Sequence, residues 1–147
     1  PPPPLFFFTP TTAYALLRSL VGSEMCIRDR TITNAKVEDL KEVLSTIRLM
    51  GAKVEIEKAS IKITPPKAIQ PIQVQTNPFP RFPTDLQAQL MAVLIFAKGV
   101  SKIQENVFPN RFIHVAELRK LGANITIKEN AAKIIGVNGL AGAKIQA

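Results

Sequence analysis

The sequence contains a single cysteine, and this scarcity excludes whole classes of site. One thiol, Cys26, can form neither a disulfide framework nor a thiolate metal centre within the chain. The sequence also lacks a metal-ligand cluster, a nucleophile triad and a glycine-rich phosphate loop. We therefore expect a site without a metal, and the lone thiol agrees with a reducing, cytoplasmic location.

Long apolar runs are missing as well. The longest, residues 90–97, has the length of a buried helix segment and falls well short of the roughly 18–20 residues that a membrane helix needs. With 46% hydrophobic and 20% charged residues, the composition is that of an ordinary soluble globular protein. We expect a chain with a sizeable core and no membrane partner.

Positive charge is what the sequence has in excess. It carries 19 Lys and Arg against 11 Asp and Glu, a net charge of +8. Such a balance suits nucleic acid, an anionic membrane surface or an anionic substrate. The basic residues are scattered rather than gathered into a run, for example at Lys36, Lys53, Lys62, Lys98, Lys128 and Lys144. We interpret most of them as solvated and expect no nucleic-acid partner.

Residues 1–30 differ from the rest of the chain. They begin with a run of prolines ahead of an aromatic run and show no helical or strand period. Residues 19–30 resemble a conceptual translation of sequencing-adapter DNA. We expect residues 1–30 to be a non-native or disordered leader, and the alternative is a native extension with a short helix over residues 13–20.

An internal repeat organises the remainder. Residues 31–34 are expected to form a strand, residues 36–50 an amphipathic helix that Gly51 ends, and residues 53–57 and 60–63 a hairpin. The phrase Gly51-Ala52 returns as Gly122-Ala123, again between a helical pattern and an alternating strand. Such a repeat predicts stacked units that bury their helical faces together.

Between the two copies the sequence predicts a second helix and two more strands. Strands are expected at residues 72–75 and 100–108, and Thr84 with Gln87 has the spacing of a capping box at a helix start. That helix is apolar almost all round from residue 90 to 97, so it should lie inside the domain. With strands at 133–137 and near 143–146, the element order is βαββ followed by βαβαββ.

Three residues near this helix are candidates for a site. Asp85 falls in the first helical turn, where the helix dipole favours a carboxylate by about 0.3–1 kcal/mol, so an ordinary helix-start residue is the alternative. Arg111 lies in a strand-to-helix loop and is otherwise a surface residue, while Val107 is otherwise a strand valine. We interpret His114, at the start of a short helix, as structural.

Two segments resemble motifs of the UDP-N-acetylglucosamine enolpyruvyl transferases, bacterial enzymes that begin cell-wall precursor synthesis. The segments are Phe82-Pro83-Thr84-Asp85-Leu86-Gln87-Ala88-Gln89 and Asn110-Arg111-Phe112-Ile113-His114-Val115. The resemblance runs from about residue 31 to 147 and implies a partial C-terminal domain with repeat units at about 31–64 and 71–147. The implied fold class is α/β, in α+β layers. It is an incomplete inside-out α/β barrel of βαβαββ repeats with central helices.

The resemblance also implies roles for the candidate residues. Asp85 would contact the sugar hydroxyl that receives the enolpyruvyl group and is a candidate base. The Val107 backbone would hold the UDP-sugar, and Arg111 would face the interdomain cleft, where a guanidinium suits phosphate or carboxylate. The implied substrates are UDP-N-acetylglucosamine and phosphoenolpyruvate, with no cofactor. The family's catalytic cysteine belongs to an N-terminal domain missing here, and Cys26 does not match its surroundings.

The sequence departs from the family pattern at two positions and admits other readings of its function. Arg81 replaces a smaller residue before the first motif, and Pro109 replaces an acidic residue before the second. The sister family acting on shikimate phosphate ranks lower because it lacks the paired motifs. A non-catalytic UDP-sugar-binding remnant and a basic βαβαββ RNA-binding module are two competing hypotheses. We expect the isolated fragment to be inactive.

Overall fold

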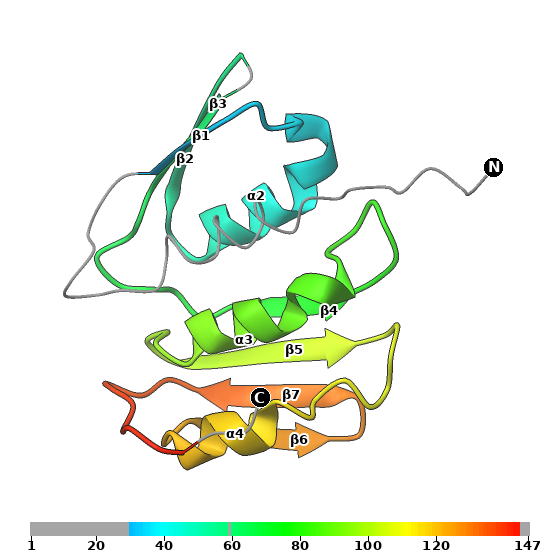
Figure 1. Ribbon diagram of the computed structural model, residues 1–147, viewed down its shortest axis with the longest axis vertical. Coiled ribbons are helices and arrows are strands. Elements are labelled where there is room, and N and C mark those ends of the chain that lie inside the picture. Colours follow the sequence, from blue (N-terminus) through cyan, green and yellow to red (C-terminus); the bar gives the residue numbers. More distant parts are fainter. Residues whose placement is uncertain (1–29, 59, 145–147) are drawn as a thin grey trace.

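The computed structural model describes residues 30–58 and 60–144. Two open sheets lie at opposite ends of this part of the molecule in Figure 1, and the helices at residues 41–49 and 87–94 lie between them. The predicted leader lies outside the described residues except for Arg30, which begins the first strand. The boundaries expected for the leader and the two repeat units remain predictions.

The first unit is a three-stranded antiparallel sheet with one helical segment. Its strand order is β1-β3-β2. The helix expected at residues 36–50 begins as a 3-10 turn and continues as an α-helix whose Val43, Leu44 and Ile47 are buried. The elements are β1 (Arg30–Thr33), η1 (Val37–Leu40), α2 (Lys41–Leu49), β2 (Lys53–Glu57) and β3 (Ser60–Thr64).

The second unit is a four-stranded sheet with a βαβ crossover. Strand β4 pairs in parallel with β5, and α3 makes the connection between them, whereas β7 is antiparallel to both β5 and β6. The strand order is β4-β5-β7-β6. The elements are β4 (Gln73–Thr76), η2 (Thr84–Leu86), α3 (Gln87–Leu94), β5 (Val100–Glu105), α4 (Val115–Lys120), β6 (Asn124–Lys128) and β7 (Ala131–Ile135).

The predicted repeat is confirmed by the topology. The orders β1-β3-β2 and β5-β7-β6 are the same, and in each unit a helix and a glycine precede the hairpin. Gly51 and Gly122 have φ values of 95° and 98°, a left-handed conformation in which a side chain is strained. The described residues thus follow the predicted order, βαββ and then βαβαββ, without closing a barrel.

Helix α3 contributes strongly to the core, as its apolar sequence predicted. Leu90, Met91 and Leu94 of α3 are fully buried, and so is Ile47 of α2. Figure 1 shows α2 below the first sheet and α3 above the second, so the two helices occupy the middle layer. The apolar stripe of α2 meets one sheet, whereas α3 has no exposed residue and only Ala88, Gln89 and Ala92 are partly accessible.

Several predicted strand boundaries are wrong. The strand expected at 100–108 ends at Glu105, because the backbone turns there and the next residues form a loop. Strand β7 begins at Ala131 rather than at Lys133 and ends at Ile135. Ala143 and Lys144 lie in no strand, and the remainder of the strand expected at 143–146 falls outside the described residues.

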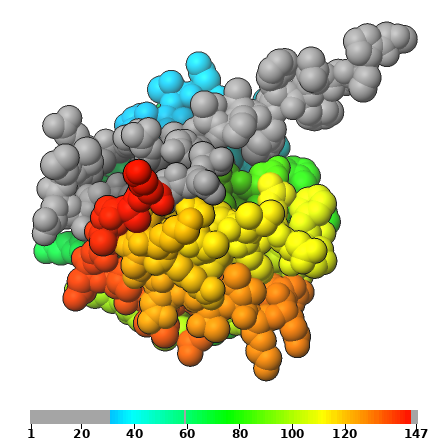
Figure 2. Space-filling view, turned by 60° about the horizontal axis from the view of Figure 1, so that its bottom comes forward, coloured from blue at the N-terminus to red at the C-terminus, as the bar shows by residue number. Residues whose placement is uncertain are grey.

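The chain after β7 is hydrogen-bonded to the rest of the second unit. The N–H of Gly136 donates to the Gly99 carbonyl at 2.9 Å, and that of Val137 donates to the Ile95 carbonyl at 2.8 Å. Further on, the Ala141 N–H donates to the Leu121 carbonyl at the end of α4. Figure 2 shows this last described segment, in red, lying against the amber surface of α4.

Gly136→Ala should destabilise the protein strongly. An added Cβ would overlap the Ala97 carbonyl oxygen, which is backbone and cannot rotate away. Overpacking of this kind typically costs about 1–3 kcal/mol and occasionally more. Gly139→Ala is the matched control, since nothing lies within 4 Å of its added Cβ. Urea unfolding of both variants measures the difference, and equal midpoints would contradict the described packing.

Candidate functional site

The turn between β4 and α3 carries Asp85. The Asn77 N–H donates to the Phe82 carbonyl at 3.0 Å, and the Phe82 ring is buried, so this proline-rich loop is held at both ends. The 3-10 turn η2 then begins at Thr84. Asp85 in its first turn has a side chain that is 81% exposed.

The predicted capping box is wrong. The Thr84 hydroxyl does not cap the helix but donates to Glu105 Oε2, 2.9 Å away on another element. Gln87 is fully buried, and its amide atoms have no hydrogen-bond partner among the described residues. The capping spacing is present, but the helical turn begins at Thr84 itself with Pro83 in the N-cap position, and the Thr84 side chain turns to Glu105 instead of back to the helix start.

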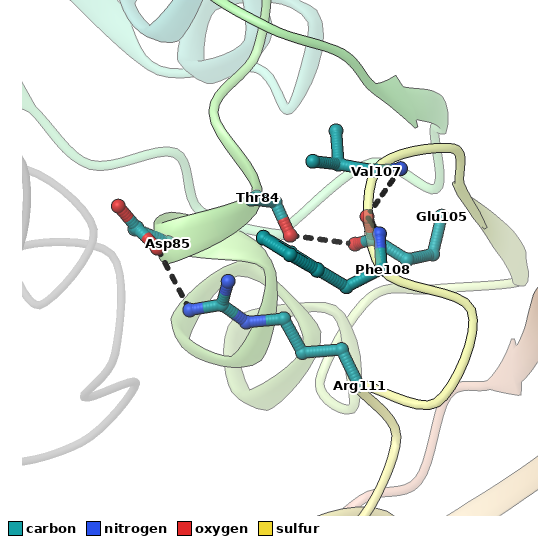
Figure 3. A network of polar contacts seen from close by, with 6 residues as sticks. All are labelled: Thr84, Asp85, Glu105, Val107, Phe108 and Arg111. Atoms are coloured by element: carbon teal, nitrogen blue, oxygen red, sulfur yellow. Dashed lines mark hydrogen bonds and ion pairs between the residues drawn. The ribbon is translucent and has the colours of Figure 1, made fainter.

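Glu105, which no motif of the sequence singles out, lies at the base of the site. This last residue of β5 is 1% exposed and points toward the turn that carries Thr84 (Figure 3). Its Oε1 accepts the N–H groups of Val107 at 2.9 Å and Phe108 at 3.0 Å, while Oε2 accepts Thr84. The alternating burial of β5 places Glu105 on the same inward face as Ser101 and Ile103.

These hydrogen bonds keep the buried carboxyl ionised. Burial in itself raises the pKa of Glu105, but the Phe108 N–H, the Thr76 hydroxyl, the Val107 N–H and the Thr84 hydroxyl together outweigh it. The pKa of Glu105 is therefore held below its ordinary value of 4.5. A buried negative charge that is fully hydrogen-bonded is stable, whereas the same charge without partners would be costly.

Arg111 joins Asp85 to the loop after β5. Its Nη2 lies 2.7 Å from Asp85 Oδ1, and its guanidinium carbon lies 5.4 Å from the centroid of the Phe108 ring. The contacts form a closed ring, from Glu105 through Thr84 to Asp85 and back through Arg111 and Phe108 (Figure 3). Because the ion pair is exposed, it orients the two side chains more than it stabilises the fold.

A cavity of about 610 Å³ opens beside this ring. Asp85 and Val107, two of the predicted site residues, both line it, whereas Arg111 is not part of the lining and is joined to it through its ion pair with Asp85. The walls come from both units: Asp39, Glu42 and Val43 from η1 and α2, and Asn77, Pro78, Phe79, Arg81, Pro83, Thr84, Leu86 and Gln89 from the β4–α3 segment. The cavity therefore lies at the junction of the two repeats.

His114 stays outside the cavity lining, as its structural interpretation implies. Burial lowers the pKa of His114, the nearby Arg111 charge lowers it further, and a hydrogen bond with the Arg111 backbone raises it. Its Nε2 is buried without a hydrogen-bond partner among the described residues. Of the two departures from the family pattern, Arg81 lines the cavity and Pro109 lies in the loop after β5.

Two features of the described residues bear on the class of site. No helix there combines the length and apolarity needed to cross a membrane. The same residues contain no group of three or more His, Cys, Asp or Glu side chains placed to hold a metal ion. The charged side chains that line the cavity are the carboxylates of Asp39, Glu42 and Asp85 and the guanidinium of Arg81.

The motifs around Asp85 and Arg111 belong to a stretch with known relatives. The family model described as EPSP synthase (3-phosphoshikimate 1-carboxyvinyltransferase) matches residues 11–147. The chain belongs to the EPSP synthase family. The match begins at residue 11, within the segment expected to be a leader.

Relatives in this family are enolpyruvyl transferases by name. The UDP-N-acetylglucosamine 1-carboxyvinyltransferase of Desulfosudis oleivorans is 41% identical over 128 residues, covering 87% of this chain and 31% of that protein. The enzyme of the same name from Nitratiruptor sp. is 42% identical over 131 residues, covering 86% and 31%. The chain thus spans about a third of the length of these relatives.

Solved structures of the EPSP synthase family share the fold. The enolpyruvyl transferase NikO from Streptomyces tendae superposes with a TM-score of 0.74 at 18% identity, covering 86% of this chain and 29% of that one. EPSP synthase from Acinetobacter baumannii gives a TM-score of 0.65 at 17% identity, covering 90% and 29%. The layered α/β architecture predicted from the sequence is therefore correct.

Glu105→Gln should make stability less dependent on pH. A lowered folded pKa means that the carboxylate stabilises the fold fully above the ordinary value of 4.5, and that this stabilisation is lost as the pH falls through the lowered value. At pH 7 we expect the variant to be less stable by about 1–3 kcal/mol.

Unfolding free energies from pH 7 down to pH 3 give the measurement. The gap between wild type and variant should narrow below pH 4.5. His114 titrates in both proteins and cancels in the difference. A gap that stays constant across this range would show that the charge of Glu105 does not matter.

Proposed function

We propose that the chain is part of a cytoplasmic UDP-N-acetylglucosamine 1-carboxyvinyltransferase of peptidoglycan precursor synthesis. One observation carries the proposal: Asp85 and Val107 line one cavity, and Arg111 is paired with Asp85 at 2.7 Å. Support also comes from the relatives, since those named for UDP-N-acetylglucosamine are about 40% identical, whereas an EPSP synthase with the same fold is 17% identical.

In this proposal the whole enzyme transfers enolpyruvyl from phosphoenolpyruvate to the sugar 3-hydroxyl and releases inorganic phosphate. Asp85 accepts the proton of that hydroxyl. Its carboxylate is exposed and only one of its oxygens is engaged by Arg111, so an incoming hydroxyl can reach it. A general base placed in this way typically contributes about 10²–10⁴-fold to the rate.

Arg111 and Val107 bind substrate in the same proposal. The guanidinium uses one nitrogen for Asp85 and keeps further N–H donors for a phosphate or carboxylate. The Val107 N–H is already donated to Glu105, so its carbonyl is the backbone group left for a sugar hydroxyl. The proposal assigns no cofactor and no metal to the site.

The proposal needs a second domain, with the catalytic cysteine, to cover the cavity. Bringing both substrates together in a closed cleft is worth up to about 7–11 kcal/mol, which a half-open site cannot supply. An RNA-binding role has no specific observation in its favour. The competing hypothesis, a remnant that binds a UDP-sugar without catalysis, would use the same site.

A chimera tests the function. We expect that the Nitratiruptor enzyme, with its matching segment replaced by residues 31–147 of this chain, releases phosphate from phosphoenolpyruvate and UDP-N-acetylglucosamine. Asp85→Asn in the chimera should lower kcat by about 10²–10⁴-fold, because the base is lost. Glu129→Gln, on the β6–β7 turn away from the cavity, is the control and should change nothing.

Activity of the Asp85→Asn chimera equal to that of its parent would refute the role of Asp85. An inactive parent chimera with a normal melting temperature would refute the proposed function itself, because the segment would then fold without working.

The chain alone should bind but not react. Without the covering domain we expect no phosphate release above that of an Asp85→Asn control, measured colorimetrically with both substrates present. Isothermal titration with UDP-N-acetylglucosamine measures the binding, and the activity of the chimera then separates an enzyme segment from a remnant. Release above the control would contradict the two-domain requirement, and binding without activity in the chimera would favour the remnant.

A further inference from the structure

Glu105 connects the two segments that carry the site, and this contact has a consequence for the proposed function. One segment is the turn with Thr84 and Asp85, and the other is the loop with Val107 and Phe108. They are joined in sequence only through α3 and β5. Within the ring of contacts, the buried carboxylate binds both segments directly.

We propose that Glu105 is the positioning residue of this site and sets the separation between Asp85 and Val107. It does not reach the cavity, which its side chain does not line, so it acts through the groups it holds. Oε2 fixes Thr84, the residue before Asp85, and Oε1 fixes the N–H of Val107 itself. The inference rests on the proposed function and deepens it.

The same carboxylate also determines whether Arg111 reaches Asp85. By accepting the Phe108 N–H, Glu105 holds the loop that leads to Arg111, and the Phe108 ring lies under the guanidinium. Loss of the bond to Thr84 frees the Asp85 side of the ring, while the loop side keeps its two N–H bonds. The exposed ion pair then closes only in a fraction of the molecules.

A purely structural role makes a different prediction, and Ser101 provides the comparison. Ser101 lies at the opposite end of β5, is fully buried, and accepts the Ile72 N–H at 3.3 Å. Like Glu105 it joins a separate segment to β5 through a side chain. Removing its hydroxyl costs stability but leaves the site residues in place, since Ser101 does not line the cavity.

The experiment compares Thr84→Val with Ser101→Ala in the whole chain. Thr84→Val keeps the side-chain shape and removes the donor to Glu105; because Thr84 also lines the cavity, the Arg111 signal rather than sugar binding decides the positioning role. Melting temperature monitors the fold. NMR signals of the Arg111 guanidinium monitor the ion pair, because hindered rotation of the guanidinium depends on its partner. Titration with UDP-N-acetylglucosamine monitors the site.

We expect Thr84→Val to lose the hindered Arg111 signal and to weaken UDP-sugar binding about tenfold or more, as for loss of a hydrogen bond to a charged group. Ser101→Ala should keep both the hindered Arg111 signal and the UDP-sugar binding, although its melting temperature falls about as much as that of Thr84→Val. Glu105→Gln is expected to retain both in part, since its oxygen can accept the two N–H groups and its amide can donate to the Thr84 hydroxyl.

An unchanged Arg111 signal in Thr84→Val, or an equal loss in Ser101→Ala, would overturn the proposal. If the wild-type chain does not bind the UDP-sugar, this result counts against the proposed function but not against the positioning role. The guanidinium signal decides the positioning role in that case, because it needs no ligand.

Discussion

The candidate site depends on one buried carboxylate. Glu105 accepts hydrogen bonds from Thr84 on one segment and from the Val107 and Phe108 N–H groups on another, and lies between the two (Figure 3). The charge remains in the interior because every bond it accepts favours the ionised form, and the pKa is lowered despite burial. The exposed ion pair between Asp85 and Arg111 therefore lies on two segments that the buried Glu105 carboxylate holds together.

The layered fold explains why the cavity forms where it does. Each unit buries its helix against its own sheet, and α3 is apolar enough to be enclosed between the two. The two units therefore meet along a helical layer, and a hollow remains at the end of that layer, where η1 and α2 face the β4–α3 turn. Its walls come from both units, so neither unit alone would form it.

Much of the fold could be predicted from the sequence, because periodicity and glycine placement are local signals. The repeat, the element order and the buried α3 are confirmed, and Gly51 and Gly122 have the left-handed conformation expected of them. The contact of the Thr84 side chain could not be predicted correctly, since the Glu105 carboxylate that accepts its hydroxyl lies 21 residues away in sequence. The end of β5 was missed for a related reason: Glu105 ends the strand by binding the following N–H groups.

The site was predictable only in part. The resemblance identified Asp85, Val107 and Arg111, but nothing in their spacing indicated that Asp85 and Arg111 pair. Glu105 left one usable signal, the alternation of β5, which places it on the inward face with Ser101 and Ile103. The parallel pairing of β4 and β5 puts the loops that follow them at one edge of the sheet, and the unusual residues Arg81 and Pro109 both fall in these loops. Substitutions can therefore accumulate at the mouth of the cavity while the strand register beneath it is preserved, which lets ligand preference diverge without a change of scaffold.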